Sequence, residues 1–497
     1  MNREHLLTDE QMRSFLTNGF LVLKSDLPRE FHLDLRKKCD AAVEKNHGNP
    51  GNNILPLVPE MQQVFDSPNI SGALSSVLGK RYIMHPHRHM HGNANSPGGG
   101  WHKDSYWGYT QKIRNHRPWW VMIMYYPQDV VTADGPTGVL PGRQCHLDRG
   151  EKDDEGADAV TGEAGTCFMI HYDLWHCATK NTSGMNRQMC KYEFIRLESP
   201  TEGETTWNSN SPEWRDPAAL PPFQHRGMWR QQWNFLRGQK RPADHAHAAT
   251  LEGRWIDDLK SSDPRQRMSA ADAVERCGRN SADAIPNLAA LLSDDYEPAA
   301  INAAYALAAA GPAALPALTE CLKSERARIS LYAAYAFAAM GHEAIPAMLD
   351  AIVAPSADVR AQAAFALGEI QEGNGDVVGA LARACKDEAP RVRMHAVEAL
   401  GMRGKAATRG LPALIDALKD SDTETRFDAA LALTRFGPNA VEAIPALAAA
   451  LQDPDRYVRG YSIEALHQIG TLEAYSALVP HLKAARWCTT TGPKSLF

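Results

Sequence analysis

The sequence predicts two parts of different fold class: a two-sheet β jelly roll, also called a double-stranded β-helix, and after it an all-α solenoid. From about residue 80 to residue 196, short apolar segments follow the two-residue period of β-strands. After about residue 260, aromatic residues become rare and alanine and leucine dominate. In that second half an Ile-Pro or Leu-Pro step recurs about every 32 residues, the length of one helical repeat.

The N-terminal elements are expected to be helices around one short strand. Thr8 and Gln11 are spaced as a capping box at the start of a helix. Residues 20–23 are expected to form a short buried strand after Gly19, and residues 31–45 an amphipathic helix. The strand-like segments that follow are WWVMIMYYP, TGVLPG, GTCFMI and MCKYEFIRL. Helices followed by a run of short strands predict a jelly roll with an N-terminal helical layer.

The C-terminal half consists of repeats of two helices. The proline steps stand at Ile285-Pro286, Leu315-Pro316, Ile345-Pro346, Leu411-Pro412 and Ile444-Pro445, with one degenerate repeat near Val377-Val378. Each step begins an apolar helix, and a polar turn such as DEAPRVR leads to a second helix such as MHAVEALGMR. This pattern predicts an α-solenoid of six or seven units, and it resembles HEAT repeats of the short bacterial kind also found in phycobilisome lyases.

Composition changes set the expected boundaries between these parts. We expect a catalytic domain over residues 1–240, a linker over 241–261, the solenoid over 262–485 and a C-terminal tail over 486–497. The segment QKRPADHAHAAT has the polar, proline-bearing character of a linker.

The overall composition excludes several classes of protein. Hydrophobic residues make up 44% and charged residues 23%, as in a packed globular chain. A net charge of −6, without a basic cluster, argues against nucleic acid and anionic membranes as partners. No apolar run approaches the roughly 18 residues of a membrane span, and the N-terminus lacks a signal-peptide core. The nine cysteines form no C-x-x-C pair, which predicts reduced thiols and a cytoplasmic location.

A His-x-Asp pattern is the first sign of a metal site, because residues two apart on a strand face the same side. The pattern occurs at His32/Asp34, His102/Asp104, His146/Asp148 and His171/Asp173. The first pair lies in a predicted helix, where side chains two apart diverge. The third enters the charged stretch DRGEKDDEGAD and is expected to be solvated. The second and fourth pairs remain candidates.

The pair His102/Asp104 follows a Gly-Gly-Gly turn and is the stronger candidate. A third ligand is expected at His176, which follows Asp104 by 72 residues. His171 competes for that role, but its odd offset from His176 puts the two on opposite faces of a strand. Two imidazoles and one carboxylate leave three coordination positions open, as in non-heme iron(II) oxygenases. Trp101, Tyr106 and Trp107 are expected to border the pocket.

Arg187 is the candidate for binding a cosubstrate carboxylate. It follows His176 by eleven residues, and the turn Asn-Thr-Ser-Gly between them predicts a hairpin that brings the two together. A planar guanidinium binds a carboxylate through two parallel hydrogen bonds. We therefore expect 2-oxoglutarate to chelate Fe(II) through its 2-oxo acid end and to place its far carboxylate on Arg187. Asn93 is a weaker candidate for a cosubstrate contact.

Several motifs together resemble the phytanoyl-CoA dioxygenase family over roughly residues 7–240. They are LTDEQMRSFLTNGF, WHKD, YYPQD, GPTGVLPG and LWHCATKNTSGMNR. The resemblance implies a jelly roll that binds Fe(II) through His102, Asp104 and His176 and 2-oxoglutarate through Arg187, and that uses O2 to hydroxylate C–H bonds with release of succinate and CO2. Family halogenases replace the carboxylate with a small residue, so Asp104 favours hydroxylation.

One motif departs from the family pattern. Family members usually have Ser-His after the Pro-Gly turn, whereas this chain has Arg143, Gln144 and Cys145 between Gly142 and His146. The departure leaves the role of His146 open.

Four further histidines, called the histidine row below, stand at His85, His87, His89 and His91. Their two-residue period puts them on one face of a predicted strand. A second metal site and a pocket wall are both consistent with this pattern, and we favour the pocket wall. The candidates for the substrate pocket are His89, His91, Trp101, Lys103, Tyr106 and Trp120. Trp119 and Trp120 are also suited to the core.

The substrate is not specified by these motifs. Because no polybasic stretch suggests a site for the CoA phosphates, a small polar metabolite or biosynthetic intermediate is favoured. The choice between hydroxylation, desaturation and another oxidation stays open. The solenoid is expected to brace the catalytic domain, to mediate self-association or to dock a protein partner, and tetrapyrrole handling follows only from the lyase resemblance. The alternative function is therefore a protein- or peptide-directed hydroxylase, or an interaction scaffold.

Overall fold

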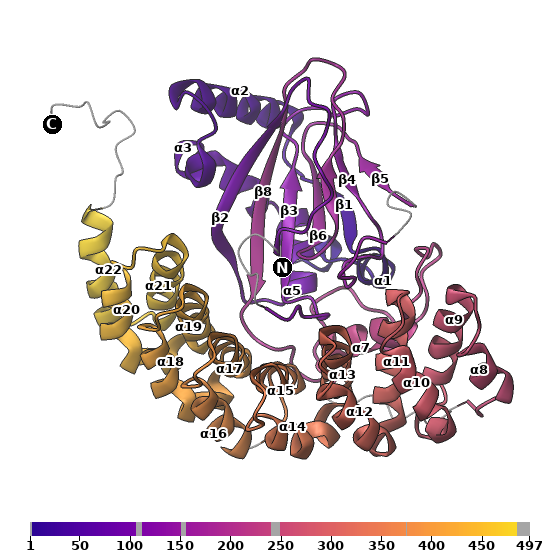
Figure 1. Cartoon of the computed structure of the whole chain (residues 1–497). Coiled ribbons are helices and arrows are strands. Elements are labelled where there is room, and N and C mark those ends of the chain that lie inside the picture. Colours follow the sequence, from indigo (N-terminus) through magenta and orange to yellow (C-terminus); the bar gives the residue numbers. More distant parts are fainter. Residues whose placement is uncertain (1, 106–111, 151–155, 240–248, 374, 485–497) are drawn as a thin grey trace.

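The computed structural model describes residues 2–105, 112–150, 156–239, 249–373 and 375–484. Two packed β-sheets with helices beside them form the N-terminal part, and paired helices form an arc beneath it (Figure 1). The arc curves around one end of the sheets, so that the two parts are in contact along the concave side of the arc. The predicted multidomain class, a jelly roll followed by an α-solenoid, is confirmed.

All strand pairs of the two described sheets are antiparallel. The strands are β1 (Phe20–Lys24), β2 (Tyr82–Asn93), β3 (Trp120–Tyr125), β4 (Thr137–Val139), β5 (Asp158–Val160), β6 (Thr166–His171), β7 (His176–Ala178) and β8 (Arg187–Arg196). The larger sheet has the order β1-β6-β3-β8-β2, and the smaller sheet has the order β5-β4-β7. Except for β4 and β5, neighbouring strands in these sheets are not consecutive in the chain, as expected for a jelly roll.

A layer of helices covers the outer face of the larger sheet. The N-terminal helices are α1 (Asp9–Asn18), α2 (Arg29–Lys45), α3 (Ile54–Leu57), α4 (Gln62–Asp66) and α5 (Pro68–Leu78). The predicted capping box between Thr8 and Gln11 is present at the start of α1. Phe65 of α4 packs on Tyr192 of β8, with ring centroids 4.4 Å apart. Helix α7 (Arg226–Leu236) lies between the sheets and the solenoid (Figure 1).

The prediction that residues 20–23 form a buried strand is wrong in one respect. Residues 20–24 do form β1, but β1 is the edge of the larger sheet and is only half-buried. Val22 in particular keeps 54% of its surface exposed. An edge strand pairs on one side only, so its run of apolar residues does not guarantee burial on both faces.

The solenoid stacks helices in pairs. The outer helices are α8 (Gly253–Asp258), α10 (Ile285–Leu291), α12 (Leu315–Leu322), α14 (Ile345–Ala351), α16 (Gly375–Ala384), α18 (Leu411–Ala417), α20 (Ile444–Ala450) and α22 (Leu472–Ala484). The inner helices are α9 (Pro264–Glu275), α11 (Glu297–Ala310), α13 (Ala327–Met340), α15 (Ala357–Ile370), α17 (Pro390–Arg403), α19 (Thr423–Phe436) and α21 (Arg456–Ile469). Each predicted proline step lies in the first turn of an outer helix, at α10, α12, α14, α18 and α20.

Small residues allow the inner helices to approach closely. A Cβ atom built on Gly401 of α17 would lie 2.7 Å from the Cβ atom of Ala432 on α19. Contacts that short do not occur between carbon atoms, so a larger side chain at residue 401 would force the helices apart. The alanine-rich composition of this half therefore reflects the narrow spacing of the stack.

A recurring ion pair, called the Arg–Asp ladder below, joins successive repeats at four places among the described residues. An arginine near the start of one inner helix binds an aspartate 27 residues later through two nitrogen atoms, and its third nitrogen donates to carbonyls of its own turn. The pairs are Arg267–Asp294, Arg360–Asp387, Arg393–Asp420 and Arg426–Asp453. In the Arg393 pair, the two side chains are 13% and 10% exposed. These pairs are bidentate and largely shielded, so they stabilise the stack more than surface ion pairs do.

One helical stretch, Glu297–Leu322, is long and apolar enough by composition to cross a membrane. It comprises α11 and α12, which are separated by a turn at Gly311 with φ of +68°. Two thirds of its most apolar 18-residue window are buried inside the protein, as expected for core helices of a solenoid.

We predict that Arg393→Met lowers the free energy of unfolding of the solenoid by about 1–3 kcal/mol, because Asp420 loses a charge-assisted partner. Burial opposes ionisation of Asp420, but Arg393 and the Asp422 amide lower its pKa overall. The stabilisation should therefore be complete above pH 3.8 and be lost as the pH falls below that value. Thermal unfolding measured by calorimetry at several pH values tests this. Lys386→Met, in an exposed pair with Asp416, is the matched control and should change stability little.

Candidate metal centre

Backbone pairing brings two of the predicted ligands together. His102 lies outside the regular strands but forms a single β-bridge with His176. The backbone N–H of each residue donates to the carbonyl of the other, both at 3.0 Å. His176 is the first residue of β7, in the smaller sheet. The two imidazole centroids are consequently 4.4 Å apart.

Each imidazole is oriented by a carbonyl two residues earlier. His102 Nδ1 lies 2.9 Å from the Gly100 carbonyl, and His176 Nδ1 lies 2.9 Å from the Leu174 carbonyl. A carbonyl can only accept a hydrogen bond, so each Nδ1 carries a hydrogen, and Nε2 is the ring nitrogen left to bind a metal. This tautomer is the one that binds a metal through Nε2.

Asp104 completes the group. Its Oδ2 atom lies 3.4 Å from His176 Nε2 and 2.8 Å from Lys191 Nζ. Burial favours the protonated form of Asp104, yet His176 and Lys191 together hold its pKa well below the ordinary value. Burial and the neighbouring His176 lower the pKa of His102. Ligand atoms of His102, Asp104 and His176 all lie within 4.8 Å of one another, and no other such group occurs among the described residues. Two imidazoles and one carboxylate are a donor set for Fe(II).

Arg187 lies at the start of β8, on the same strand face as Lys191. Its Nε and Nη2 atoms donate to the Gly135 carbonyl at 3.0 and 2.8 Å. Gly135 has φ of +69°, and a Cβ atom there would lie 2.3 Å from Asn93 Nδ2. Only glycine fits this position, which explains the glycine of the Gly-Pro-Thr motif.

The remaining guanidinium nitrogen of Arg187 fits an anionic ligand. Arg187 is 1% exposed and forms no ion pair with a carboxylate in the described part of the chain. Its Nη1 atom and the Thr137 hydroxyl are both buried without a hydrogen-bond partner there. Both flank Tyr126, whose ring lies 5.9 Å from the guanidinium carbon and whose hydroxyl accepts from the Thr137 N–H. A buried, uncompensated cation is costly, so this arrangement suits the far carboxylate of 2-oxoglutarate.

Two asparagines hold the loops around Arg187. Asn93 Nδ2 donates to the carbonyls of Gly135 and Thr179, at 3.0 and 3.1 Å, and its Oδ1 atom is buried without a partner among the described residues. Asn181 Nδ2 donates to three carbonyls, those of Asn93, Asp134 and Met185. Asn93 is paired across the strands with Arg187 and supports the loop that carries Gly135. Its Oδ1 atom is left without a partner among the described residues.

Family models match both parts of the chain. Residues 31–189 match phytanoyl-CoA dioxygenase (PhyH), and residues 345–433 and 411–488 match HEAT repeats. The chain carries a phytanoyl-CoA dioxygenase domain. The family and the His-His-Asp group identify an Fe(II)- and 2-oxoglutarate-dependent oxygenase, whose cofactors are Fe(II), 2-oxoglutarate and O2.

Several solved structures resemble part of the chain. EctD from S. alaskensis with bound Fe is 16% identical, with a TM-score of 0.34, and the match covers 43% of this chain and 86% of EctD. HygX from Streptomyces hygroscopicus with iron bound is 13% identical, with a TM-score of 0.32 and coverage of 38% and 87%. SnoK, an alpha-ketoglutarate-dependent carbocyclase from nogalamycin biosynthesis, is 17% identical, with a TM-score of 0.33 and coverage of 40% and 87%. A comparison with curated proteins found no match.

The other His-x-Asp pairs lie elsewhere in the dioxygenase domain. His32 is in α2 and lies 2.8 Å from the Tyr125 hydroxyl. His171 ends β6, and Asp173 faces Arg114 at 3.9 Å near the solenoid. The expectation that the third pair is solvated is wrong for His146, which is buried with its Nε2 atom 2.8 Å from His225 Nε2.

His146 helps to join the two parts of the protein. His225 Nδ1 lies 2.7 Å from the side-chain oxygen of Asn302 on α11, and therefore carries a hydrogen. His225 Nε2 then accepts, and His146 Nε2 donates to it. The polar stretch after His146 is anchored as well, because the N–H groups of Leu147 and Asp148 donate to Glu297 of α11. The prediction therefore fails at His146, whose partner His225 lies far along the chain, whereas the Asp148 side chain that follows is exposed.

The remaining pocket candidates are divided between the metal group and the core. Trp101 lies over Gly138 of β4, where a Cβ atom would be 3.3 Å from the indole. Trp120 packs against His85 and Tyr172, with centroids 5.2 and 4.9 Å away. The structure does not bring Lys103 to the metal group, because the side chain points to the opposite side and donates to the Gln144 carbonyl at 2.9 Å. Tyr106 and Trp107 lie outside the described residues.

The histidine row lies on β2 and approaches the metal group at one end. His89 is paired across the strands with Lys191, the partner of Asp104, and His91 with Met189. The rings of His87 and His89 are stacked 5.9 Å apart, and those of His89 and His91 meet edge to face at 4.6 Å. The row is not grouped tightly enough to form a second metal site among the described residues.

Lys191, Thr137 and Tyr126 are site residues that the sequence analysis missed. Lys191 and Glu193 belong to the segment MCKYEFIRL, which was treated only as a strand. Charged residues at positions 187, 191 and 193 of a buried strand were the available signal, because these three share one face.

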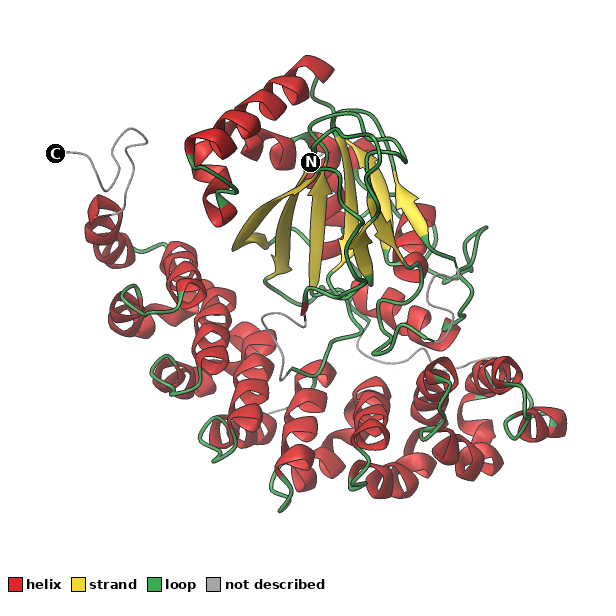
Figure 2. Cartoon of the chain, turned by 45° about the horizontal axis from the view of Figure 1, so that its top comes forward, coloured by secondary structure: helices red, strands yellow, loops and turns green. Residues whose placement is uncertain are grey.

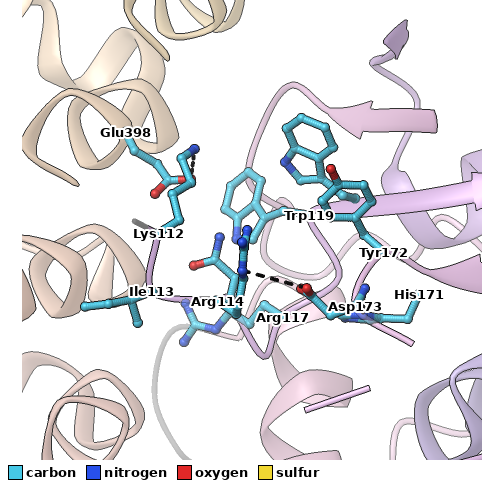
Figure 3. A pocket seen from close by; sticks show the side chains of 11 residues that line it. Lys112, Ile113, Arg114, Arg117, Trp119, His171, Tyr172, Asp173 and Glu398 are labelled. Carbon is cyan, nitrogen blue, oxygen red and sulfur yellow. Dashed lines mark hydrogen bonds and ion pairs between the residues drawn. The ribbon is translucent and has the colours of Figure 1, made fainter. Parts of the chain in front are cut away.

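The segment that follows the metal ligands is held by the solenoid (Figure 3). Lys112 Nζ lies 3.1 Å from Glu398 of α17 and 2.7 Å from Asp428 of α19. The Ile113 N–H donates to His395 of α17. Lys112, Ile113 and Glu398 border a small cavity of about 30 Å³ between the two parts.

Further contacts extend along the same segment. The Arg114 side chain donates to the carbonyl of Ser105, the residue after Asp104. The Tyr335 hydroxyl donates to the backbone carbonyl of Arg114. His116 lies 2.9 Å from the Tyr305 hydroxyl, and Arg117 pairs with Glu369. Inner helices α11 to α19 therefore all bind residues 112–117.

We predict that Lys112→Met destabilises the joined domains by about 3–5 kcal/mol, because it leaves two carboxylates buried without their cation. Asp428→Asn should cost much less. Burial raises the pKa of Asp428 to about 7, so an uncharged side chain is already tolerated there. Thermal unfolding and limited proteolysis of residues 112–117 measure both effects. Equal losses in the two variants would contradict this account of the interface.

Proposed function

We propose that this oxygenase hydroxylates an unactivated C–H bond of a small metabolite or biosynthetic intermediate, with release of succinate and CO2. His102, Asp104 and His176 would bind the iron. The observation that carries the proposal is the convergence of two imidazole Nε2 atoms and one carboxylate within 4.8 Å. Three protein ligands leave room for a bidentate keto acid and for O2. Asp104 supports hydroxylation rather than halogenation, since a carboxylate holds the position that a halide would need.

Arg187 is proposed to bind the far carboxylate of 2-oxoglutarate. The cosubstrate with iron and O2 supplies the oxidation of the C–H bond, and this chain supplies position and charge. Arg187 would offer its Nη1 atom, and the Thr137 hydroxyl would add a second donor beside it. The Gly135 carbonyl fixes the guanidinium before the ligand arrives, which reduces the entropy lost on binding.

The solenoid is proposed to brace the catalytic domain. HEAT repeats generally bind proteins on their concave surface. In this chain the concave helices α11 to α21 contact the dioxygenase domain itself, from Glu297 near one end to Tyr457 near the other. Because the dioxygenase domain already occupies the concave surface, these contacts favour a bracing role for the solenoid. They disfavour the docking of a partner protein on that surface. A partner or a second copy would have to use another face.

We also propose a reducing, cytoplasmic location. The cysteines of the described residues are free thiols. Cys39 and Cys190 are buried neighbours that interact through their side chains without forming a disulfide. Two adjacent unoxidised thiols support a reducing compartment.

The anaerobic addition of Fe(II) and 2-oxoglutarate tests the cofactor sites without a known substrate. We predict that the wild-type protein develops the weak visible charge-transfer band of the iron chelate. His102→Ala and Asp104→Ala should abolish the band, and with it succinate formation, because each removes one of three protein ligands. His467→Ala, an exposed histidine on α21, is the control and should keep the band. Full turnover in either ligand variant would rule out this assignment.

Arg187→Met separates cosubstrate binding from metal binding. We predict that its apparent Kd for 2-oxoglutarate rises by about 10- to 100-fold, the effect of losing charge-assisted hydrogen bonds. Metal binding should change little, since Arg187 contacts none of the three ligands in the described structure. Titration of the chelate band measures the first quantity, and metal analysis the second. Arg29→Met, in an exposed pair with Asp129, is the control, and an unchanged Kd in Arg187→Met would refute the role.

A further inference from the structure

The histidine row connects the metal group to the last HEAT repeat. His91 is at the metal end, and its Nε2 atom is buried without a hydrogen-bond partner in the described part of the chain. His87 is at the other end, where its Nδ1 atom lies 2.8 Å from the hydroxyl of Tyr457, the second residue of α21. His87, His89 and His91 are all partly exposed, as are His102 and Asp104. Partly exposed polar groups therefore lie along β2 from the metal group to the solenoid, with the buried Lys191 side chain beside them.

Close packing fixes α21 against β2. A Cβ atom on Gly460 would lie 2.5 Å from the ring of Pro86. Pro86 stands where the pairing of β2 with β8 is interrupted, between Met84 and Arg88. The rings of Tyr457 and Tyr461 both pack on His85 at 5.2 Å. The backbone of α21 at Gly460 therefore packs directly against Pro86 of β2. This packing holds Tyr457 beside the histidine row.

Two cations flank the row from opposite ends. Lys191 lies at the metal end, and its carboxylate partner is Asp104, a proposed iron ligand. Arg456 lies at the solenoid end, where it donates to the Tyr457 hydroxyl at 2.9 Å and its guanidinium lies 4.7 Å over the Tyr457 ring. Arg456 is exposed and forms no ion pair with a carboxylate of the described residues. Both charges act on His87 and His89 and, together with burial, lower their pKa values.

Apart from Asp104, which pairs with Lys191, the nearby acid Glu193 adds little negative charge at pH 7. Glu193, beside His85 at 3.1 Å, is buried, and burial raises the pKa of its carboxyl to about 8. The row itself is neutral at pH 7, because burial and the charge of Lys191 lower the pKa of His87 to about 4. With Asp104 committed to iron, the surface beside the metal group carries net positive charge. Such a surface attracts and orients anions.

We propose that the substrate carries an anionic group, a carboxylate or phosphate, and lies along the histidine row between Lys191 and Arg456. The last HEAT repeat then forms part of the substrate site, with Arg456 and Tyr457 as specificity-determining residues. This inference rests on the proposed function, since the position of the substrate is defined by the proposed iron ligands.

The test uses the full-length protein loaded with Fe(II) and 2-oxoglutarate. The probe is a panel of carboxylic acids and phosphate monoesters, each paired with its uncharged amide or alcohol, screened for stimulated succinate release. The expected result is stimulation by anionic members and not by their uncharged partners. In Arg456→Gln, KM for a stimulating anion should rise about tenfold while kcat changes little, because one charge-assisted contact is lost away from the reacting atoms. Tyr457→Phe should raise KM in the same direction by a smaller factor.

Arg326→Gln is the matched control, because Arg326 is an exposed arginine immediately before inner helix α13. It should leave KM unchanged. Stimulation by uncharged members, stimulation by no anionic member, or an equal KM in Arg456→Gln and the wild type would overturn the proposal. Failure of the proposed function looks different: the chelate band would then be missing from the wild-type protein before any panel compound is added.

Discussion

Lys112 lies buried between Glu398 and Asp428, and the position of the metal site depends on this contact between two domains. The proposed metal ligands His102 and Asp104 lie in an extended segment that pairs with a strand of three residues, through His102 with His176 and through the Gly99 N–H with the Ala178 carbonyl. Such a short pairing contributes little order by itself. A few residues later the chain reaches Lys112, where the cost of burying one cation is offset by two carboxylates from neighbouring helices. The solenoid therefore supplies the rigidity that the smaller sheet lacks.

Local patterns were sufficient to predict the architecture. The proline steps and the polar turns recur at similar intervals, so the same two-helix pattern could be recognised several times along the chain. The strands of the jelly roll were recognisable from their two-residue period and turn residues. The error at residues 20–23 came from the same source, because apolar composition predicts a strand without telling whether a neighbour covers it. Val22 is exposed because no strand pairs beyond β1 in the larger sheet.

The candidate site shows where sequence reasoning stops. His102, Asp104 and His176, which the structure brings together, could all be named from the sequence. The first two follow a local two-residue spacing, and the third belongs to a family motif. Lys103 was predicted to line the substrate pocket because His102 and Asp104 on either side of it are site candidates. In the extended backbone its side chain instead reaches the Gln144 carbonyl. His146 looked solvated because Glu297 and His225, which surround it, lie far along the chain. Tyr457 could not be assigned at all, since no sequence pattern connects a repeat turn with β2.

These contacts make the solenoid and the metal site thermodynamically coupled. Docking of α21 places Tyr457 beside His87, and docking of α17 and α19 holds the segment after Asp104. Any ligand that favours the ordered site must then favour the docked solenoid by the same free energy. The reverse also holds: a molecule bound on the outer helices would change affinity at the metal site if it altered the curvature of the arc. Stacked repeats transmit such changes because each repeat contacts only its neighbours, and the Arg–Asp ladder ties those neighbours together. A brace built from repeats is therefore also a route by which a distant surface can act on the oxygenase.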